Sequence, residues 1–163
     1  FRRFKLFFAL AAAIMAGIGG YLVLFRSHPA EATLRKAFKM AEEGDLEGVL
    51  SLVDRDGPLG VLLEEDGGRI KRAFEDFLAK YKLEISRPSF QIRSEKNRAE
   101  VELSGGTLRV YSRSNPGIPA LAVGLGESEL IFYMERKDGR WLVEDVNQDL
   151  AQWITGEYIP FSW

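Results

Sequence analysis

The hydrophobic pattern begins with an unbroken apolar run at residues 6–25, which contains no charged residue, proline, asparagine or glutamine. At about 1.5 Å per residue, a helix over this run spans the roughly 30 Å hydrocarbon core of a bilayer. We therefore expect residues 1–29 to form a transmembrane anchor and its linker. A cleaved signal peptide is the alternative, because Ala-Glu-Ala at 30–32 resembles a cleavage site, but such peptides have a shorter apolar region of about 7–15 residues.

The charges that flank this run predict its orientation. Arg2, Arg3 and Lys5 precede the run, whereas Arg26 follows it. The more basic flank of a membrane helix stays in the cytoplasm. We therefore expect a bacterial inner-membrane location, with a cytoplasmic N-terminus and a periplasmic domain, and the inverted orientation is the alternative.

Small residues within the run fall on two adjacent rows at helical spacing. Such rows let two membrane helices approach closely, so we expect them to face a partner helix. The alternative is that glycine and alanine are simply common in membrane helices. The candidate interface residues here are Ala9, Ala12, Ala13, Ala16, Gly17 and Gly20.

Apolar residues then recur at i, i+3, i+4 and i+7 in three segments, with charged residues on the opposite side. This pattern predicts an amphipathic helix from Pro29 to Gly44, a second that Asp45 caps, and a third over residues 70–81. The turn signals at 56–58 end the second helix. The apolar run at 59–63 is interpreted as a short strand, although it is too brief for periodicity to decide.

From residue 83 onward the pattern alternates between apolar and polar residues, which predicts strands. Pro88 suggests a bulge or a late strand start. Gly105-Gly106 is interpreted as a two-residue hairpin turn, because Leu103 would then face Leu108 and neighbouring acidic and basic residues would also pair.

The next fifteen residues, 112–126, are rich in glycine and proline and are expected to form a loop. Residues 128–136 are apolar on both faces, as in a central strand that is covered on both sides. Asp138-Gly139 is a strong hairpin signal that returns the chain as a last strand over 141–146. The sequence therefore predicts an α+β fold, in which a transmembrane helix is followed by three helices on a curved antiparallel sheet of four to six strands.

Charge and composition exclude several functions. The chain has 22 Lys and Arg and 24 Asp and Glu, and residues 1–29 hold four of the cations and no acid, so the remainder carries a net charge of −6. This balance disfavours nucleic-acid binding and tight docking on anionic lipid. The absence of cysteine and the single histidine, His28, exclude thiolate chemistry and a multi-histidine metal site. We expect no cofactor and no metal.

The order of these elements resembles the nuclear transport factor two-like superfamily. The resemblance rests on Glu-Gly-Asp-Leu at 43–46, the helix at 70–81 and Lys-Asp-Gly-Arg-Trp-Leu-Val at 137–143. It implies a cone-shaped domain over residues 30–147, followed by an aromatic tail at 148–163. The superfamily includes ketosteroid isomerase and polyketide cyclase relatives, but it hosts enzymes, carriers and assembly modules, so the resemblance does not assign an activity.

The resemblance implies a cavity between sheet and helix that could serve either catalysis or ligand binding. Related enzymes use an aspartate or histidine base with a tyrosine or acid donor, for which the candidates are Tyr81, Tyr111, Tyr133, Asp76 and Asp145. None of these stands in a recognisable motif, and we assign no catalytic residue. An apolar ligand or lipid in the cone is the alternative function, and aromatic residues that either line or fill such a cavity are Phe74, Phe77, Tyr81, Phe90, Tyr111, Phe132 and Trp141.

The interpretation we favour is a non-enzymatic, single-pass accessory subunit, whose extracytoplasmic domain docks on other integral membrane protein subunits. Homo-oligomerisation is a further option. Aromatic residues are enriched at protein interfaces, so the tail supplies interface candidates. These are Trp153, Tyr158, Phe161 and Trp163. The alternative is that the tail folds back on its own sheet.

Overall fold

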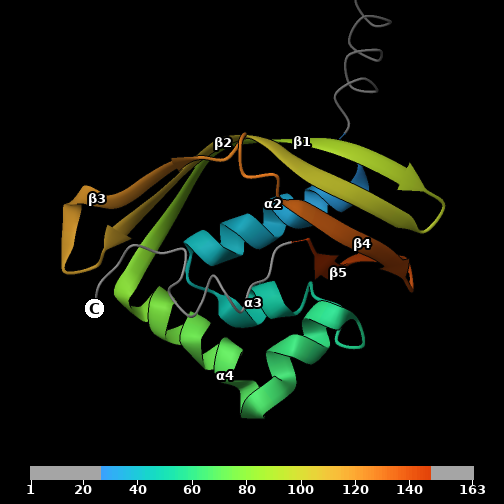
Figure 1. Ribbon diagram of the computed structural model, residues 1–163, viewed down its shortest axis with the longest axis horizontal. Coiled ribbons are helices and arrows are strands. Elements are labelled where there is room, and N and C mark those ends of the chain that lie inside the picture. The colour runs from blue at the N-terminus through green and yellow to red at the C-terminus, as the bar shows by residue number, and fades with distance from the viewer. Residues whose placement is uncertain (1–26, 148–163) are drawn as a thin grey trace, which may run out of the picture.

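The computed structural model describes residues 27–147, so the predicted anchor and aromatic tail lie outside the described residues. Within that part of the chain, no helix is both long and apolar enough to cross a bilayer. Three helices precede five strands there (Figure 1): α2 Pro29–Glu42, α3 Leu46–Leu50, α4 Pro58–Lys80, β1 Tyr81–Glu95, β2 Arg98–Ser112, β3 Asn115–Gly124, β4 Ile131–Lys137 and β5 Arg140–Val146.

The predicted starts of the first two helices are confirmed, but the predicted end of the second is wrong, because α3 stops at Leu50, well before the turn signals at 56–58. Pro29 begins α2, and the ring of His28 accepts a hydrogen bond from the backbone N–H of Ala30 at 3.1 Å. Gly44 ends the α2 region in the left-handed conformation, with φ of 75°. Asp45 caps α3 by accepting the N–H of Gly48 at 2.9 Å, which satisfies a donor that the helix itself leaves unpaired.

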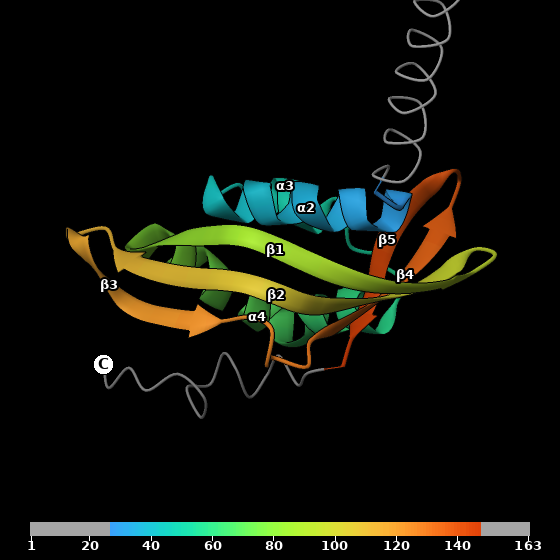
Figure 2. The same cartoon turned by 90° about the horizontal axis from the view of Figure 1, so that it is seen from above.

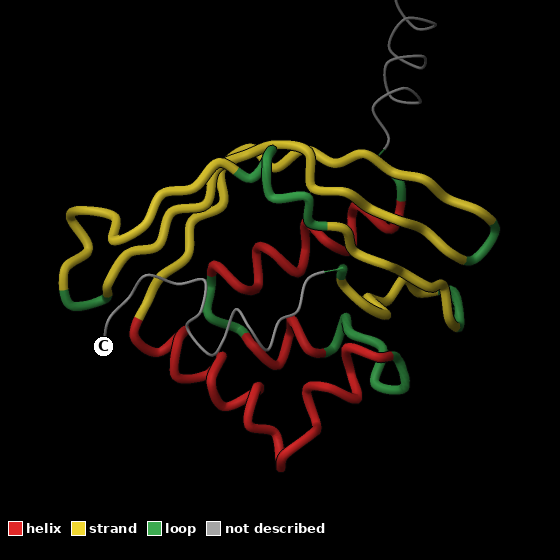
Figure 3. The backbone as a smooth tube through the Cα atoms, viewed as in Figure 1, coloured by secondary structure: helices red, strands yellow, loops and turns green. Residues whose placement is uncertain are grey.

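The third helix is longer than the sequence pattern predicted. The expected strand at 59–63 is wrong, because Pro58 begins α4 and Leu59 and Leu63 are both buried at helical spacing. Two successive glycines, Gly67 and Gly68, have φ of 64° and 76°. Their left-handed backbone turns α4, and Figure 3 shows its two arms meeting at an angle.

The sheet has the order β1-β2-β4-β5. Strand β3 pairs with the same edge of β2 as β4 does, but at the other end of β2. The predicted turn at Gly105-Gly106 is wrong, because β2 runs straight through these glycines and its hairpin with β1 lies where Glu95 pairs with Arg98. Leu103 therefore pairs with Phe90 instead of Leu108. The predicted bulge at Pro88 is confirmed by a register shift there.

Glycine is required at this bulge for a physical reason. Gly106 has φ of 112°, and a Cβ on it would lie 2.9 Å from the Cα of Pro88. The two glycines thus let β1 and β2 approach closely at the bulge. In the sequence alone, the same Gly-Gly pair resembles a hairpin turn.

The region expected to be a loop contains a strand. Residues Asn115–Gly124 form β3, although they include Pro116 and Pro119. Proline is tolerated because β3 pairs only with β2 in this sheet and so lies at its edge. The last hairpin is confirmed, since Lys137 pairs with Arg140 across Asp138-Gly139 and β4 lies between β2 and β5 as a central strand.

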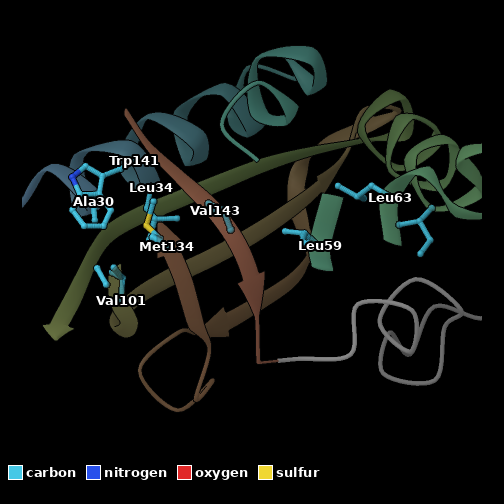
Figure 4. Packing of buried hydrophobic residues seen from close by; sticks show 10 residues of the cluster. Ala30, Leu34, Leu59, Leu63, Val101, Met134, Trp141 and Val143 are labelled. Carbon is cyan, nitrogen blue, oxygen red and sulfur yellow. The ribbon is translucent and has the colours of Figure 1, made fainter. Parts of the chain in front are cut away.

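The strands arch over the helices (Figure 1), and seen from above β1 and β2 run across α4 (Figure 2), which gives the predicted α+β plan. We call the face that the helices cover the inner face, and the opposite one the outer face. Figure 4 shows side chains of α2, α4, β2, β4 and β5 converging between the layers. The buried cluster consists of Ala30, Leu34, Leu59, Leu63, Ile70, Ala99, Val101, Met134, Trp141 and Val143.

Candidate functional site

The aromatic residues proposed for a ligand cavity pack against other side chains. The ring of Phe38 lies 5.8 Å from that of Phe90 and 5.9 Å from that of Phe132, measured between ring centroids. Trp141 is 9% exposed and its ring lies 5.3 Å from that of His28. Such ring contacts fill space between sheet and helix.

Among the described residues, two neighbouring recesses open on the outer side of the sheet. The larger has a volume of about 650 Å³, and we call it the outer recess. The smaller, of about 200 Å³, adjoins it through Arg93 and Glu100. None of the seven cavity candidates lines either recess, and their role in ligand binding stays a prediction. The outer recess is lined by Pro58, Arg93, Ser94, Glu95, Arg98, Ala99, Glu100, Tyr133, Met134, Glu144 and Asp145.

Four lining residues form one row across four strands. Arg93 of β1 pairs with Glu100 of β2, Glu100 pairs with Tyr133 of β4, and Tyr133 pairs with Asp145 of β5. Directly opposed residues in antiparallel strands have Cβ atoms about 4.5–5.5 Å apart and project from the same face. We call these four residues the polar row.

Alternation along the strands explains why the row faces outward. On β2, Ala99 and Val101 are buried on the inner face, so Glu100 between them points outward. On β4, Met134 is buried beneath and Tyr133 therefore points the other way. The apolar neighbours that build the core thus fix the direction of the polar row.

The charged groups of the polar row are largely unpaired within the part of the chain that the structure describes. Among residues 27–147, the side chains of Arg93 and Glu100 form neither an ion pair nor a hydrogen bond. Asp145 accepts the neighbouring N–H of Val146 at 2.9 Å. By contrast, Arg109 on the same sheet pairs with Glu84 at 3.1 Å. The row therefore offers free guanidinium and carboxylate groups beside a half-buried tyrosine.

A separate ion pair holds the turn before α4. Asp54 is 4% exposed, and its carboxylate accepts hydrogen bonds from the ammonium of Lys137 and from the N–H of Asp56. The hydrogen bond from Lys137 lowers the pKa of Asp54 below its ordinary 3.8, although burial opposes this shift. The same bond raises the pKa of Lys137.

Backbone bonds reinforce this contact. The N–H of Asp54 donates to the carbonyl of Val143 at 2.8 Å, and the N–H of Val143 donates to the carbonyl of Leu52 at 2.8 Å. The ion pair therefore fastens the α3–α4 connection to the final hairpin. It does not line the outer recess and is a structural contact.

The catalytic candidates are only partly brought together. Tyr133 and Asp145 are paired neighbours, whereas Tyr81 stacks on Phe77 at 5.0 Å, and Asp76 is exposed on α4. Sequence reasoning missed Arg93 and Glu100. The alternating pattern around Glu100 could have shown its outward direction, but the wrong register hid its partner.

No group of three or more acidic or histidine side chains that could hold a metal occurs among the described residues. The polar row makes the candidate site a mixed-charge surface with one aromatic ring, that of Tyr133. Its chemistry is suited to hydrogen bonds and ion pairs with another molecule.

No protein-family model and no curated protein match the chain. Solved structures that resemble it include an NTF2-like protein from Cytophaga hutchinsonii, which is 18% identical over 71% of this chain and 89% of that one, with a TM-score of 0.46. A candidate ketosteroid isomerase from Shewanella frigidimarina is 14% identical over 74% and 94%, with a TM-score of 0.47.

A further similar structure is a candidate calcium/calmodulin-dependent protein kinase II association domain from Xanthomonas campestris. It is 19% identical over 71% of this chain and 81% of that one, with a TM-score of 0.48. The resembling structures thus include proteins described as enzymes and as an association domain. The likeness assigns neither role to this chain.

Proposed function

We propose that this protein is a non-enzymatic, single-pass accessory subunit of a membrane protein complex, and that its domain docks on a partner subunit through the outer recess. The observation that carries the proposal is the polar row, where Arg93, Glu100, Tyr133 and Asp145 line one open surface. The apolar run at residues 6–25 supports the anchor.

The residue types of the row suit a protein partner. Tyrosine and arginine are enriched at protein interfaces, where a half-buried ring gives contact area and a guanidinium binds carboxylates in a bidentate way. Glu100 and Asp145 accept hydrogen bonds from a partner's lysine or arginine. Since both signs of charge are present, the surface favours a partner with the complementary arrangement and disfavours a uniformly charged one.

The packing of the interior supports a docking role over catalysis or ligand binding. The ring of Phe38 contacts those of both Phe90 and Phe132 where a ligand cavity would be expected. Of the tyrosines and carboxylates considered for acid–base chemistry, Tyr133 and Asp145 are opposed on paired strands, whereas Asp76 lies on α4 and Tyr81 stacks on Phe77. General acid–base catalysis needs its groups within hydrogen-bond reach of one substrate.

The test is site-specific photocrosslinking in the native membrane. A photoreactive residue at position 100 of the full-length protein should crosslink to one membrane protein, which mass spectrometry then identifies. The same residue at position 76, exposed on α4, is the control and should not crosslink to it. Equal crosslinking from both positions would contradict the proposal.

Charge reversal provides a second measurement. Arg93→Glu should reduce co-purification of that membrane protein in mild detergent by at least about tenfold, which corresponds to a loss of about 1.4 kcal/mol. Lys82→Glu, an exposed cation on the same strand, should leave it unchanged. If the wild-type protein purifies without any stoichiometric membrane subunit, the proposed function is wrong.

A further inference from the structure

Strand β3 has an apolar surface that the described residues leave uncovered. Its ten residues, Asn115–Gly124, include no charged residue, and all but Leu121 are exposed. Ile118 is 72% exposed and Val123 is 40% exposed. An edge strand usually carries charges that keep it soluble, so a strand without them indicates an occupant.

The register shows which face is apolar. Leu121 pairs with Val110, which is 2% exposed, and Val123 pairs with Leu108. Ala120 has no partner on β2 and forms a bulge, and Pro119 pairs with Tyr111 on the opposite face. Ile118 precedes Pro119, within a second irregularity of the register between Pro119 and Asn115, and its side chain is 72% exposed.

This apolar face is an extension of the inner face of the sheet. Val110 is buried on that face, but the exposed residues of β3 lie at the end of the arch away from β4 and β5 (Figure 1). Neither α2 nor α4 covers Ile118. A segment that covers it would bury apolar area that now faces water, and this burial stabilises by about 25 cal/mol per Å².

The chain leaves the described domain beside the loop that follows β3. Asn147 accepts the N–H of Ile131 at 2.8 Å and donates to the carbonyl of Glu129 at 2.7 Å through its side-chain amide. Glu129 is five residues after Gly124 and so lies within about 18 Å of the end of β3, and Asn147 at the exit is hydrogen-bonded to it. The residues that follow Asn147 therefore start close to the uncovered surface.

We propose that residues 148–163 return along β3 and cover its inner face. Ile118 lies six residues, or about 20 Å, from the end of β3. The path from the exit to Ile118 therefore needs about 38 Å. Sixteen extended residues span about 53 Å, which is sufficient. The segment supplies large apolar side chains for the contact, namely Leu150, Trp153, Ile154, Tyr158, Ile159, Phe161 and Trp163.

The path also has a defined direction. Since β3 runs from Asn115 to Gly124 and the exit lies near Gly124, the segment runs antiparallel to β3. Prolines 116 and 119 remove backbone donors from β3. The contact is therefore made by side chains on the inner face instead of by a continuous backbone ladder. Because it is intramolecular, no second molecule has to be ordered to form it.

The experiment compares full-length protein with the Ile118→Asp/Val123→Asp variant by limited chymotrypsin digestion in detergent. We expect cleavage after Trp153 and Tyr158 to become at least about tenfold faster in the variant, because charge on β3 releases the segment. Val61→Asp is the matched control, since Val61 is 50% exposed on α4, and its cleavage rate should equal that of wild type. Equal rates in all three proteins would overturn the proposal.

Hydrogen exchange provides the reciprocal measurement. Backbone amides of β3 should exchange faster in a chain that ends at Asn147 than in the full-length chain. If the protection of β3 instead rises with protein concentration, the occupant is a second copy of the chain. If β3 is unprotected in the purified full-length protein, the occupant is a partner or lipid. Either result overturns the proposal, and the full-length variants keep it testable should the truncated chain not fold.

Discussion

Replacement of Asp54 by asparagine should destabilise the domain in a pH-dependent way. Asparagine keeps the shape and the oxygen that accepts the N–H of Asp56, so the main loss is the charged hydrogen bond with Lys137. Hydrogen bonds to charged groups contribute about 1.5–3 kcal/mol. Lys137 is 38% exposed and also lies 3.5 Å from Glu135, so water and this second carboxylate offset part of the loss.

We therefore expect a loss of about 1.5–2 kcal/mol in the free energy of unfolding at pH 7. Urea denaturation followed by circular dichroism measures it, because the helices and the sheet both contribute to the signal. Asp56→Asn is the control. Asp56 is an exposed neighbour, and surface substitutions usually change stability by less than about 0.5 kcal/mol.

The pH dependence separates the ion pair from a packing effect. The folded pKa of Asp54 is lowered, so its contribution is fully present above the unfolded value near 3.8 and is lost as pH falls through the folded value. The difference between wild type and Asp54→Asn should therefore shrink below about pH 4. A difference that stays constant to pH 2, or one that Asp56→Asn reproduces, would refute the reasoning.

Three further substitutions test the packing and backbone arguments by the same denaturation assay. Met134→Ala should cost about 3 kcal/mol, because this side chain is 1% exposed at the centre of the core; a cost under about 1 kcal/mol would mean that the site is loosely packed. Gly106→Ala should cost about 1–3 kcal/mol from its φ of 112° and the close Pro88, whereas Gly124→Ala, with open space around it, should change little; equal effects would contradict the bulge argument. Asp45→Ala should cost about 1 kcal/mol through loss of the α3 cap, and an unchanged midpoint would show that the cap contributes nothing.

The outer recess illustrates how far sequence reasoning reaches. Tyr133 and Asp145 were candidates as single residues, but their partners Arg93 and Glu100 were not. Alternation gives the face of each residue, because it depends only on neighbours in the chain. Which residues of four strands lie in one row depends on the pairing register. The predicted turn at Gly105-Gly106 gave the wrong register for β2. The polar row was therefore not predictable without the correct pairing.

The α4 and β3 errors have related causes. A five-residue apolar run fits a strand or a buried helix equally well, and only the packing of Leu59 and Leu63 into the core selects the helix. Prolines and glycines in β3 favour a loop locally, yet pairing with β2 overrides that preference at an open edge.

The sequence by itself determined the α+β class, the helix starts at Pro29 and Asp45, the bulge at Pro88 and the last hairpin, because these signals act over a few residues through dihedral preference and hydrogen bonding. Only the tertiary structure decided the β1–β2 register, the strand at β3 and the contact between Asp54 and Lys137, which lie 83 residues apart. Such contacts form when distant segments bury a shared core. The free energy of that burial exceeds local preferences and belongs to no single stretch of the chain.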